Sequence, residues 1–301
     1  PGTASCTYNS VSETIPVGNV NGIDIETGAF NNTVQNIVGS GFYAGIFIKR
    51  DSYGNKILSN DLHDNTMLAS GLTSGAFGVL IWGHDNEIAG NTISGNDVCS
   101  PSYGRDGSAI EVYGGSGTIG ASKNIIHHNF ASNSDAFAEL GKTSSSQAAN
   151  NTFAYNEFLY NSVHNHGIFL VTRGSNDSYG PILGTKLYNN SVYITGTYKQ
   201  AIVCFAGCNS TVLKMRNNII QKAAAIYTDQ AIDENYNLFV GTIRMGGSKG
   251  ANSLQSTNTS YAGFSSIADN NFTLKGTSPA IDAGTTDNGG FTTDLSSPAH
   301  T

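Results

Sequence analysis

The sequence is organised by a repeat that residues 55–65 show most clearly, where the chain reads NKILSNDLHDN. The same spacing of asparagine and apolar residues returns as NEIAGNTISGN over residues 86–96 and as NTFAYNEFLYN over residues 151–161. Looser copies surround Asn36, Asn129, Asn190 and Asn218. Repeats of a few tens of residues indicate a solenoid, in which each unit buries its apolar face only by stacking on its neighbours.

A short strand with alternating apolar residues precedes each copy of the repeat. When these strands are aligned, their first apolar positions form one inward row: Ile23, Ile46, Val79, Ile110, Ala138, Ile168 and Ile202. The residues two positions later form a second inward row: Ile25, Ile48, Ile81, Val112, Leu140, Leu170 and Cys204. Alternation with period two indicates strands with one buried face.

Corresponding strands of this kind stack about 4.8 Å apart as parallel sheets. We therefore predict an all-β fold, a right-handed parallel β-helix that forms a single solenoid of about 8–10 coils. Asparagine tolerates the left-handed turn between strands, and its amide can bond to an asparagine one coil above.

The strand pattern fades after Met245. We expect residues 1–245 to form the β-helix with an N-terminal cap, and residues 246–301 to add a terminal coil and a C-terminal cap of the same domain. The segment 269–284 resembles the closing segment of many secreted β-helix proteins. A cap is needed because an open solenoid end exposes unpaired strand edges.

Composition excludes several classes of protein. The chain has 301 residues, 36 of them glycine, with 12% charged residues and a net charge of -7. No apolar run approaches the ~20 residues of a membrane helix, and there is no basic footprint for nucleic acid.

We expect a secreted monomer with disulfides, because the four cysteines lack zinc-site spacing. A Cys6–Cys99 bridge is favoured, whereas the core position of Cys204 disfavours a Cys204–Cys208 bridge.

Two glutamates are adjacent in the outward row between the two inward rows. This row reads Asp24, Phe47, Leu80, Glu111, Glu139, Phe169 and Val203. Like charges about 5 Å apart repel, so one carboxyl group should titrate high or share a cation. In the next outward row Trp82 lies beside Tyr113, which predicts an aromatic platform for a sugar ring.

Other charged residues fall near the two glutamates on four neighbouring coils. They are Asp106, Asp135, Lys142, His166, Arg173 and Lys199. Because coupled charges tend to mark functional sites, we predict a cleft here. Its candidate substrate-binding residues are Trp82, Tyr113, Asp106, Tyr198 and Lys199.

Over residues 20–245 the repeat resembles the pectate-lyase-like superfamily of extracellular carbohydrate-active enzymes. Within it, an acidic pair followed by Lys and then by Arg on the next coil is similar to the alginate lyase and chondroitinase B family. The resemblance implies β-elimination on an acidic, uronate-containing polysaccharide. It implies that Glu111 and Glu139 bind calcium, that Lys142 is the base and that Arg173 is the acid or the carboxylate clamp. It implies no organic cofactor.

Two other functions stay open. Glycoside hydrolysis needs one carboxyl group as acid and another as base or nucleophile, and Asp106, Glu111, Asp135 and Glu139 offer such pairs. His166 is a competing base, with an ordinary pKa near 6.5. The third alternative is a solenoid that binds glycans without catalysis.

Overall fold

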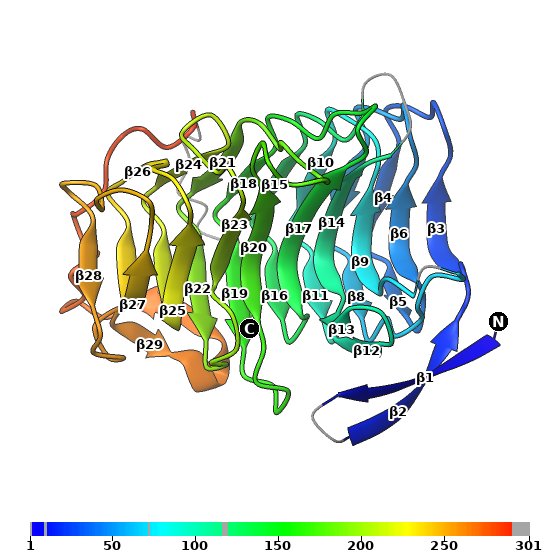
Figure 1. Ribbon diagram of the computed structural model, residues 1–301, viewed down its shortest axis with the longest axis horizontal. Coiled ribbons are helices and arrows are strands. Elements are labelled where there is room, and N and C mark those ends of the chain that lie inside the picture. Colours follow the sequence, from blue (N-terminus) through cyan, green and yellow to red (C-terminus); the bar gives the residue numbers. More distant parts are fainter. Residues whose placement is uncertain (1, 9–10, 72, 116–119, 291–301) are drawn as a thin grey trace.

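The structure is a computed structural model that describes residues 2–8, 11–71, 73–115 and 120–290. It is a parallel β-helix, as predicted, in which strands of successive coils pair side by side along one axis (Figure 1). Each coil passes through three rows of strands. No helix within these residues is long and apolar enough to cross a membrane.

The first row contains the longer strands. They are β3 (Asn21–Ile25), β6 (Ala44–Ile48), β9 (Phe77–Ile81), β14 (Ser108–Gly114), β17 (Ala136–Lys142), β20 (Ile168–Arg173), β23 (Ile202–Phe205), β25 (Ile219–Thr228) and β27 (Leu238–Arg244). One strand from each coil joins this row, in agreement with the predicted 8–10 coils. The candidate glutamates lie on its outer face.

Shorter strands make the other two rows. The second row consists of β5 (Val38–Ser40), β8 (Asp61–His63), β11 (Thr92–Ser94), β16 (Phe130–Ser132), β19 (Glu157–Tyr160), β22 (Ser191–Ile194), the first parts of β25 and β27, and β28 (Leu254–Ser256). The third row consists of β4 (Thr33–Gln35), β7 (Lys56–Leu58), β10 (Glu87–Ala89), β15 (Ile125–His127), β18 (Thr152–Ala154), β21 (Thr185–Tyr188), β24 (Leu213–Arg216) and β26 (Asp233–Asn235).

The predicted strand alignment is confirmed up to β17, where Ile110 pairs with Ala138. At β20 it is wrong by two residues, because Glu139 pairs with Val171 and not with Phe169. Phe169 is fully buried in the core. Residues 168–171 read IFLV, so alternation gives no signal that could fix the register there.

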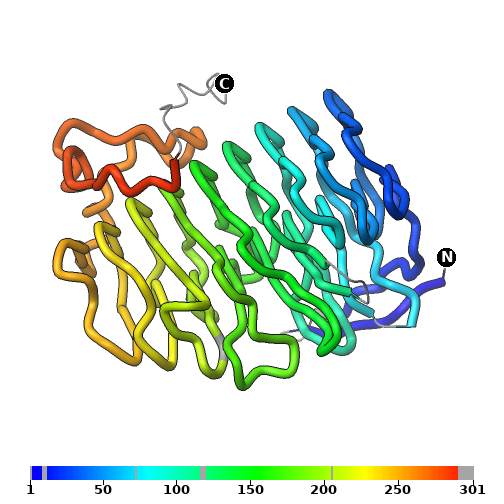
Figure 2. Tube along the Cα trace, turned by 90° about the horizontal axis from the view of Figure 1, so that it is seen from above, coloured from blue at the N-terminus to red at the C-terminus, as the bar shows by residue number. Residues whose placement is uncertain are grey.

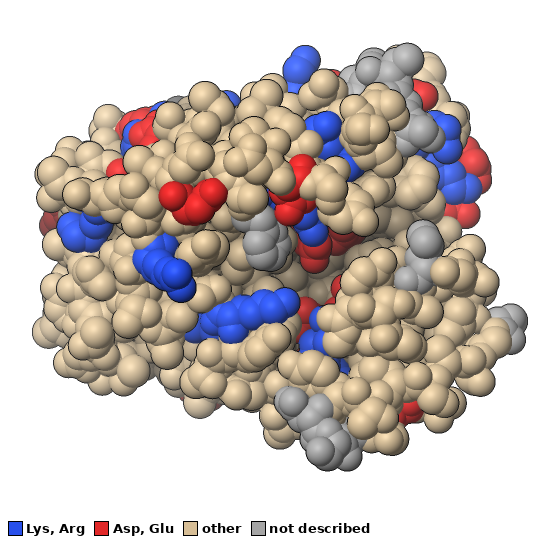
Figure 3. Space-filling view, in the orientation of Figure 1, with Lys and Arg blue, Asp and Glu red and all other residues tan. Residues whose placement is uncertain are grey.

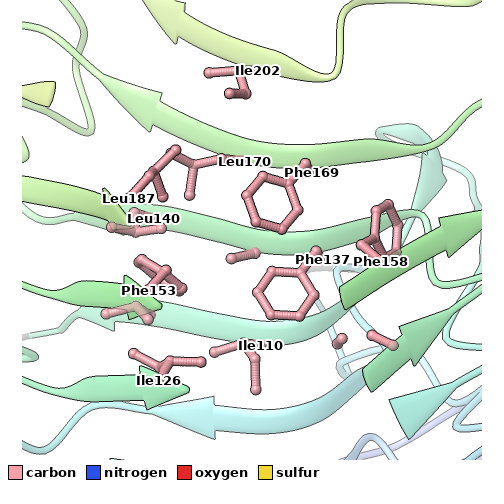
Figure 4. Close-up of a cluster of buried hydrophobic side chains, with 14 of the residues drawn as sticks. Ile110, Ile126, Phe137, Leu140, Phe153, Phe158, Phe169, Leu170, Leu187 and Ile202 are labelled. Atoms are coloured by element: carbon pink, nitrogen blue, oxygen red, sulfur yellow. The ribbon is translucent and has the colours of Figure 1, made fainter. Parts of the chain in front are cut away.

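Apolar side chains from all three rows fill the interior. The rings of Phe137 and Phe169 stack with centroids 5.0 Å apart and an interplanar angle of 22°. Phe153 from the third row and Phe158 from the second complete this layer (Figure 4). Burial of this stacked core is the main source of stability for a fold with few charges.

The asparagines of the repeat form ladders of buried side-chain amides along the coils. In one ladder each Nδ2 donates to the next Oδ1 at 2.8–3.0 Å, and its members are Asn60, Asn91, Asn129, Asn156, Asn190, Asn218 and Asn237. A second ladder joins Asn32, Asn55, Asn86, Asn124 and Asn151. The predicted amide stacking is thus confirmed.

The left-handed turns do not fall on the ladder asparagines, however. They fall on the residue before, with φ of 56° at His128 and 54° at Tyr155. Each ladder amide therefore points inward from a turn that its predecessor makes.

The N-terminal hairpin of β1 (Gly2–Tyr8) and β2 (Val11–Val17) is joined to β12 (Val98–Ser100) by the predicted Cys6–Cys99 disulfide. β12 pairs with β13 (Gly104–Asp106). A second disulfide joins Cys204 and Cys208, whose Cα atoms are 5.7 Å apart. The expectation against this bridge was wrong: Cys204 is buried, as predicted, and the turn after β23 brings the equally buried Cys208 back to it.

The C-terminal segment lies along one side of the coils (Figure 2). After the terminal coil with β28, it forms β29 (Phe264–Ser266), the short 3-10 helix η1 (Ile267–Asp269) and β30 (Asn271–Leu274). Phe264 and Phe272 pack against apolar residues of the second row, including Phe130, Leu159 and Leu238. The segment that we expected to cap the last coil therefore covers the side of the second row.

The amide ladder gives the first testable prediction. Asn156→Ala removes a fully buried amide and leaves the groups of its neighbours Asn129 and Asn190 without their partner. We expect it to lower the free energy of unfolding by about 1–3 kcal/mol, the cost of buried unsatisfied polar groups. Urea unfolding followed by circular dichroism measures this, with the exposed Asn176→Ala as control. Equal losses in the two variants would contradict a stabilising role for the ladder.

Candidate functional site

The outer face of the first row brings Glu111 of β14 and Glu139 of β17 side by side, because these residues are register partners. Both side chains point away from the core, as predicted from the alternation. Neighbouring strands lie about 4.8 Å apart, so the two carboxyl groups belong to one small site.

Arg173 at the end of β20 reaches back to this pair. Its Nη2 donates to Glu139 Oε1, and its Nη1 donates to the backbone oxygen of Leu140. Gly141 leaves room for the guanidinium, since a Cβ there would lie 3.2 Å from Arg173 Nη1 and 3.3 Å from Tyr113 Cδ2. The predicted association of Arg173 with Glu139 is therefore present, although the register that predicted it was wrong.

Asp106, the last residue of β13, joins the same site. Its carboxylate accepts hydrogen bonds from the backbone N–H of Gly107 at 2.9 Å and of Gly75 at 3.3 Å. Burial, followed by the charges of Glu139 and Asp135, raises the pKa of Asp106 to about 8. The neutral, proton-donating form of the Asp106 carboxyl group is therefore favoured relative to that of an exposed aspartate.

Glu111 is held in a similar state. Burial and the neighbouring charge of Glu139 raise its pKa well above the ordinary value, while Arg173 acts in the opposite direction. Its Oε2 accepts a hydrogen bond from Ser108 Oγ at 3.2 Å. The sequence-based expectation that one of two adjacent glutamates titrates high is confirmed for Glu111.

Asp135, His166 and Tyr198 form a second cluster beside the first. Asp135 Oδ1 contacts His166 Nδ1, and the imidazole stacks on Tyr198 with ring centroids 4.8 Å apart. Burial raises the pKa of Asp135 and lowers that of His166 to about 3. The ordinary pKa expected for His166 was wrong, and an imidazole with so low a pKa is a weak base.

Arg105 and Asp97 make a further part of the site that sequence reasoning missed. Arg105 donates to Asp97 Oδ1 at 2.7 Å and to Glu13 Oε1 at 2.9 Å, and Asp97 Oδ2 accepts from Tyr160 at 2.9 Å. The predicted Cys6–Cys99 bridge was the available signal, because it brings the N-terminal hairpin to this edge of the site.

Lys142 is not brought to the glutamates. It follows Glu139 by three positions in β17, so alternation directs its side chain to the opposite side of the strand. The side chain is buried, and Nζ donates to the backbone oxygen of Thr143 at 3.3 Å. This geometry gives no support to Lys142 as the base.

Trp82 and Tyr113 lie beside each other as predicted, with ring centroids 6.3 Å apart and an interplanar angle of 46°. Phe47 packs edge-on against Trp82 at 5.1 Å. Tyr198 and Lys199 lie together farther along the site, with Lys199 Nζ 5.6 Å from the Tyr198 ring centroid. Of the candidate substrate-binding residues, Asp106 thus belongs to the glutamate cluster and Tyr198 to the His166 cluster.

The two glutamates do not fit the calcium site that the family resemblance implied. Calcium takes six to eight oxygen ligands, usually from charged carboxylates. Here the guanidinium of Arg173 already pairs with Glu139, and burial favours the neutral form of Glu111. Among the described residues no group of three His, Cys, Asp or Glu side chains could hold a metal ion.

The space-filling view shows acidic side chains recessed in a hollow of the molecular face, with basic side chains at its edges (Figure 3). In the same orientation the long strands β14, β17 and β20 cross the middle of the molecule (Figure 1). The hollow gives a ligand access to a largely buried group of carboxyl side chains.

No family model matches the chain, and no curated protein matches it. Two solved structures share its fold, both of variants of the tailspike protein of E. coli bacteriophage HK620 in complex with a pentasaccharide. Their TM-scores are 0.50 and 0.52, at 12% and 13% sequence identity. The matches cover 81% and 76% of this chain but 53% and 49% of the tailspike chains, so this chain spans about half their length. The likeness places the chain among β-helix folds that include a carbohydrate-binding protein.

The raised pKa of Asp106 predicts how stability depends on pH. A carboxyl group whose pKa is higher in the folded chain than in the unfolded chain stabilises the fold at low pH. This contribution is lost as the pH rises from about 4, the unfolded pKa, to about 8. Asp106→Asn should therefore reduce the fall in unfolding free energy between these pH values. Urea titrations at several pH values measure this, with the exposed Asp61→Asn as control. An unchanged slope in Asp106→Asn would show that Asp106 is not protonated in the fold.

Proposed function

We propose that this protein is a glycoside hydrolase that cleaves a polysaccharide bound in the hollow. The observation that carries this proposal is a group of carboxyl side chains in which Glu139 pairs with Arg173, whereas Asp106 and Glu111 form no ion pair with a lysine or arginine among the described residues. Pairs of this kind define the acid and base of many hydrolytic sites.

Asp106 is the proposed general acid. The neutral form of its carboxyl group is favoured, since burial raises its pKa to about 8. The two backbone N–H groups that bond to it hold the carboxyl group in place. In hydrolysis it would donate its proton to the glycosidic oxygen as the bond to the leaving sugar breaks.

Glu139 is the proposed carboxylate that assists the attack of water at the anomeric carbon of the sugar. It forms an ion pair with Arg173, and the glycine at 141 lets the guanidinium lie close. Glu111, held largely neutral beside it, would offer a hydrogen bond to a sugar hydroxyl group.

The fold similarity supports this choice of substrate class. The similar tailspike structures are complexes with a pentasaccharide.

β-Elimination on a uronate polymer, the function that the sequence favoured, is the second outcome that an assay must distinguish. It requires a base at C5 and a cation to neutralise the carboxylate. Lys142 does not reach the glutamates, and the guanidinium of Arg173 is already paired. The contacts at the site therefore favour hydrolysis. Secretion of the protein remains part of the proposal, because its substrate would be an extracellular polysaccharide.

The test is incubation with a panel of neutral and uronate-containing glycans, with and without chelator. Hydrolysis releases reducing ends without new absorbance near 235 nm, whereas β-elimination produces that absorbance. We expect reducing ends alone, and no effect of the chelator. Absorbance near 235 nm would contradict hydrolysis, and absence of cleavage on every glycan would favour binding alone.

Two substitutions test the assigned roles. Glu139→Gln and Asp106→Asn should each lower kcat by roughly 10²–10⁴-fold, the usual contribution of a positioned acid or base. The wild-type protein should lose activity above pH of about 8, as Asp106 loses its proton, and this limb should be absent from Asp106→Asn. Glu87→Gln on the third row is the matched control and should keep full activity. Wild-type kcat in Asp106→Asn would contradict the assignment.

A substitution at Gly141 tests whether the ion pair between Arg173 and Glu139 contributes to activity. In Gly141→Val the added side chain would occupy the position of the guanidinium and separate Arg173 from Glu139. We expect kcat to fall at least ten-fold while the circular dichroism spectrum stays that of the folded protein, and we expect the midpoint of urea unfolding to fall because the separated charges lose their partner. Unchanged kcat would show that the ion pair does not contribute to activity.

A further inference from the structure

We propose that the glycan bound in the hollow is uncharged, without uronate carboxylates or sulfate groups. This inference rests on the proposed function, since it concerns the substrate of the same site. It departs from the acidic polysaccharide that the sequence predicted, and it comes from the partners of the arginines and lysines near the carboxyl groups.

The two arginines of the site are already committed to carboxylates of the protein itself. Arg173 pairs with Glu139, and its Nε lies 3.6 Å from Asp177 Oδ1. Arg105 pairs with Asp97 at 2.7 Å and with Glu13 at 2.9 Å, and its side chain is 1% exposed. A sugar carboxylate could bind either guanidinium only by displacing a protein carboxylate that would then be left buried and unpaired.

The lysines near the hollow also provide few cations that could bind a sugar carboxylate. The ammonium of Lys222 is buried and donates to the backbone oxygens of His166, Gly167 and Tyr198. Lys142 is buried and bonds to a backbone oxygen. All fifteen Lys and Arg residues of the chain belong to the described residues, and near the hollow the exposed one is Lys199, at the edge beside Tyr198.

Carboxyl groups, by contrast, are in excess. Within the described residues no lysine or arginine forms an ion pair with Asp106, Glu111 or Asp135. An anionic sugar placed among them would be desolvated without a partner cation, and it would repel Glu139 and every neighbour that ionises. The electrostatics of the hollow therefore select against an acidic ligand.

The remaining surface suits a neutral sugar. Exposed tyrosines border the site: Tyr103 is 58% exposed, Tyr179 50% and Tyr198 51%. The ring centroid of Tyr179 lies 5.5 Å from Arg173 Cζ, so Tyr179 is next to the residue that pairs with Glu139. Aromatic rings can cover the apolar faces of a sugar ring, while carboxyl groups bond to its hydroxyl groups.

Matched pairs of polymers test the charge of the ligand. Polygalacturonate, alginate and hyaluronan are each compared with their carboxyl-reduced form, and neutral mannans, xylans and N-acetylglucosamine-containing glycans complete the panel. Affinity electrophoresis of the full chain in gels that contain each polymer measures binding without requiring cleavage. We expect retardation by one or more neutral glycans, and at least ten-fold weaker binding of any uronate form than of its reduced partner.

A charge variant provides a second measurement. Glu111→Lys places a cation in the hollow and should raise the relative affinity for uronate forms at least ten-fold, whereas Asp61→Lys on the exposed second row should leave it unchanged. Wild-type binding to a uronate form as tight as to its reduced form would overturn the proposal, as would failure of every neutral glycan to bind. Binding of a neutral glycan without cleavage would contradict hydrolysis but support the uncharged ligand. Hydrolysis of a uronate polymer would support hydrolysis and overturn the uncharged ligand.

Discussion

The buried amide ladders are the constraint on which the rest of this structure depends. A side-chain amide that is removed from water must find partners for its N–H groups and its oxygen, and here each asparagine finds them on the neighbouring coils. A ladder of this kind allows one register between coils, because a shift by one residue would leave every amide unsatisfied. Through the ladder, a local choice of asparagine at each turn fixes the relative position of strands that are 19 to 38 residues apart in sequence.

Because the register between coils is fixed, outward-pointing residues from different coils are brought together in one site. Glu111 and Glu139 have no sequence proximity, yet they are register partners on adjacent coils. Arg173 comes from a third coil, and Gly141 leaves the space through which it contacts Glu139. The β12–β13 hairpin adds Asp106 and Arg105 from outside the rows, and the N-terminal hairpin adds Glu13, which pairs with Arg105. Burial among so few cations then raises the pKa of Asp106 and of Glu111.

The sequence predicted what depends on periodicity and missed what depends on three-dimensional packing. The repeat predicted the β-helix, the amide stacking, the Glu111–Glu139 pair and the Trp82–Tyr113 platform. The alignment misplaced β20 because the run IFLV has no alternation. It assigned Lys142 to the glutamates because the residues are close in sequence, although alternation directs the Lys142 side chain to the opposite face of β17. Arg105 and Asp97 carry no repeat signal, since Arg105 lies in the hairpin between coils and Asp97 directly precedes that hairpin. The burial that lowers the pKa of His166 depends on the packing of several coils, which the sequence alone does not give.

The central claim is that the carboxyl groups of Asp106 and Glu139 act on a glycan in the hollow. The most direct measurement is a crystal structure of Glu139→Gln with an oligosaccharide from a neutral glycan that binds to the protein. We predict that a sugar ring lies in the hollow against Tyr113, with a glycosidic oxygen within hydrogen-bond distance of the Asp106 carboxyl group. An oligosaccharide bound instead on the outer face of the third row, or in the hollow with its glycosidic oxygens out of reach of Asp106, would contradict the account.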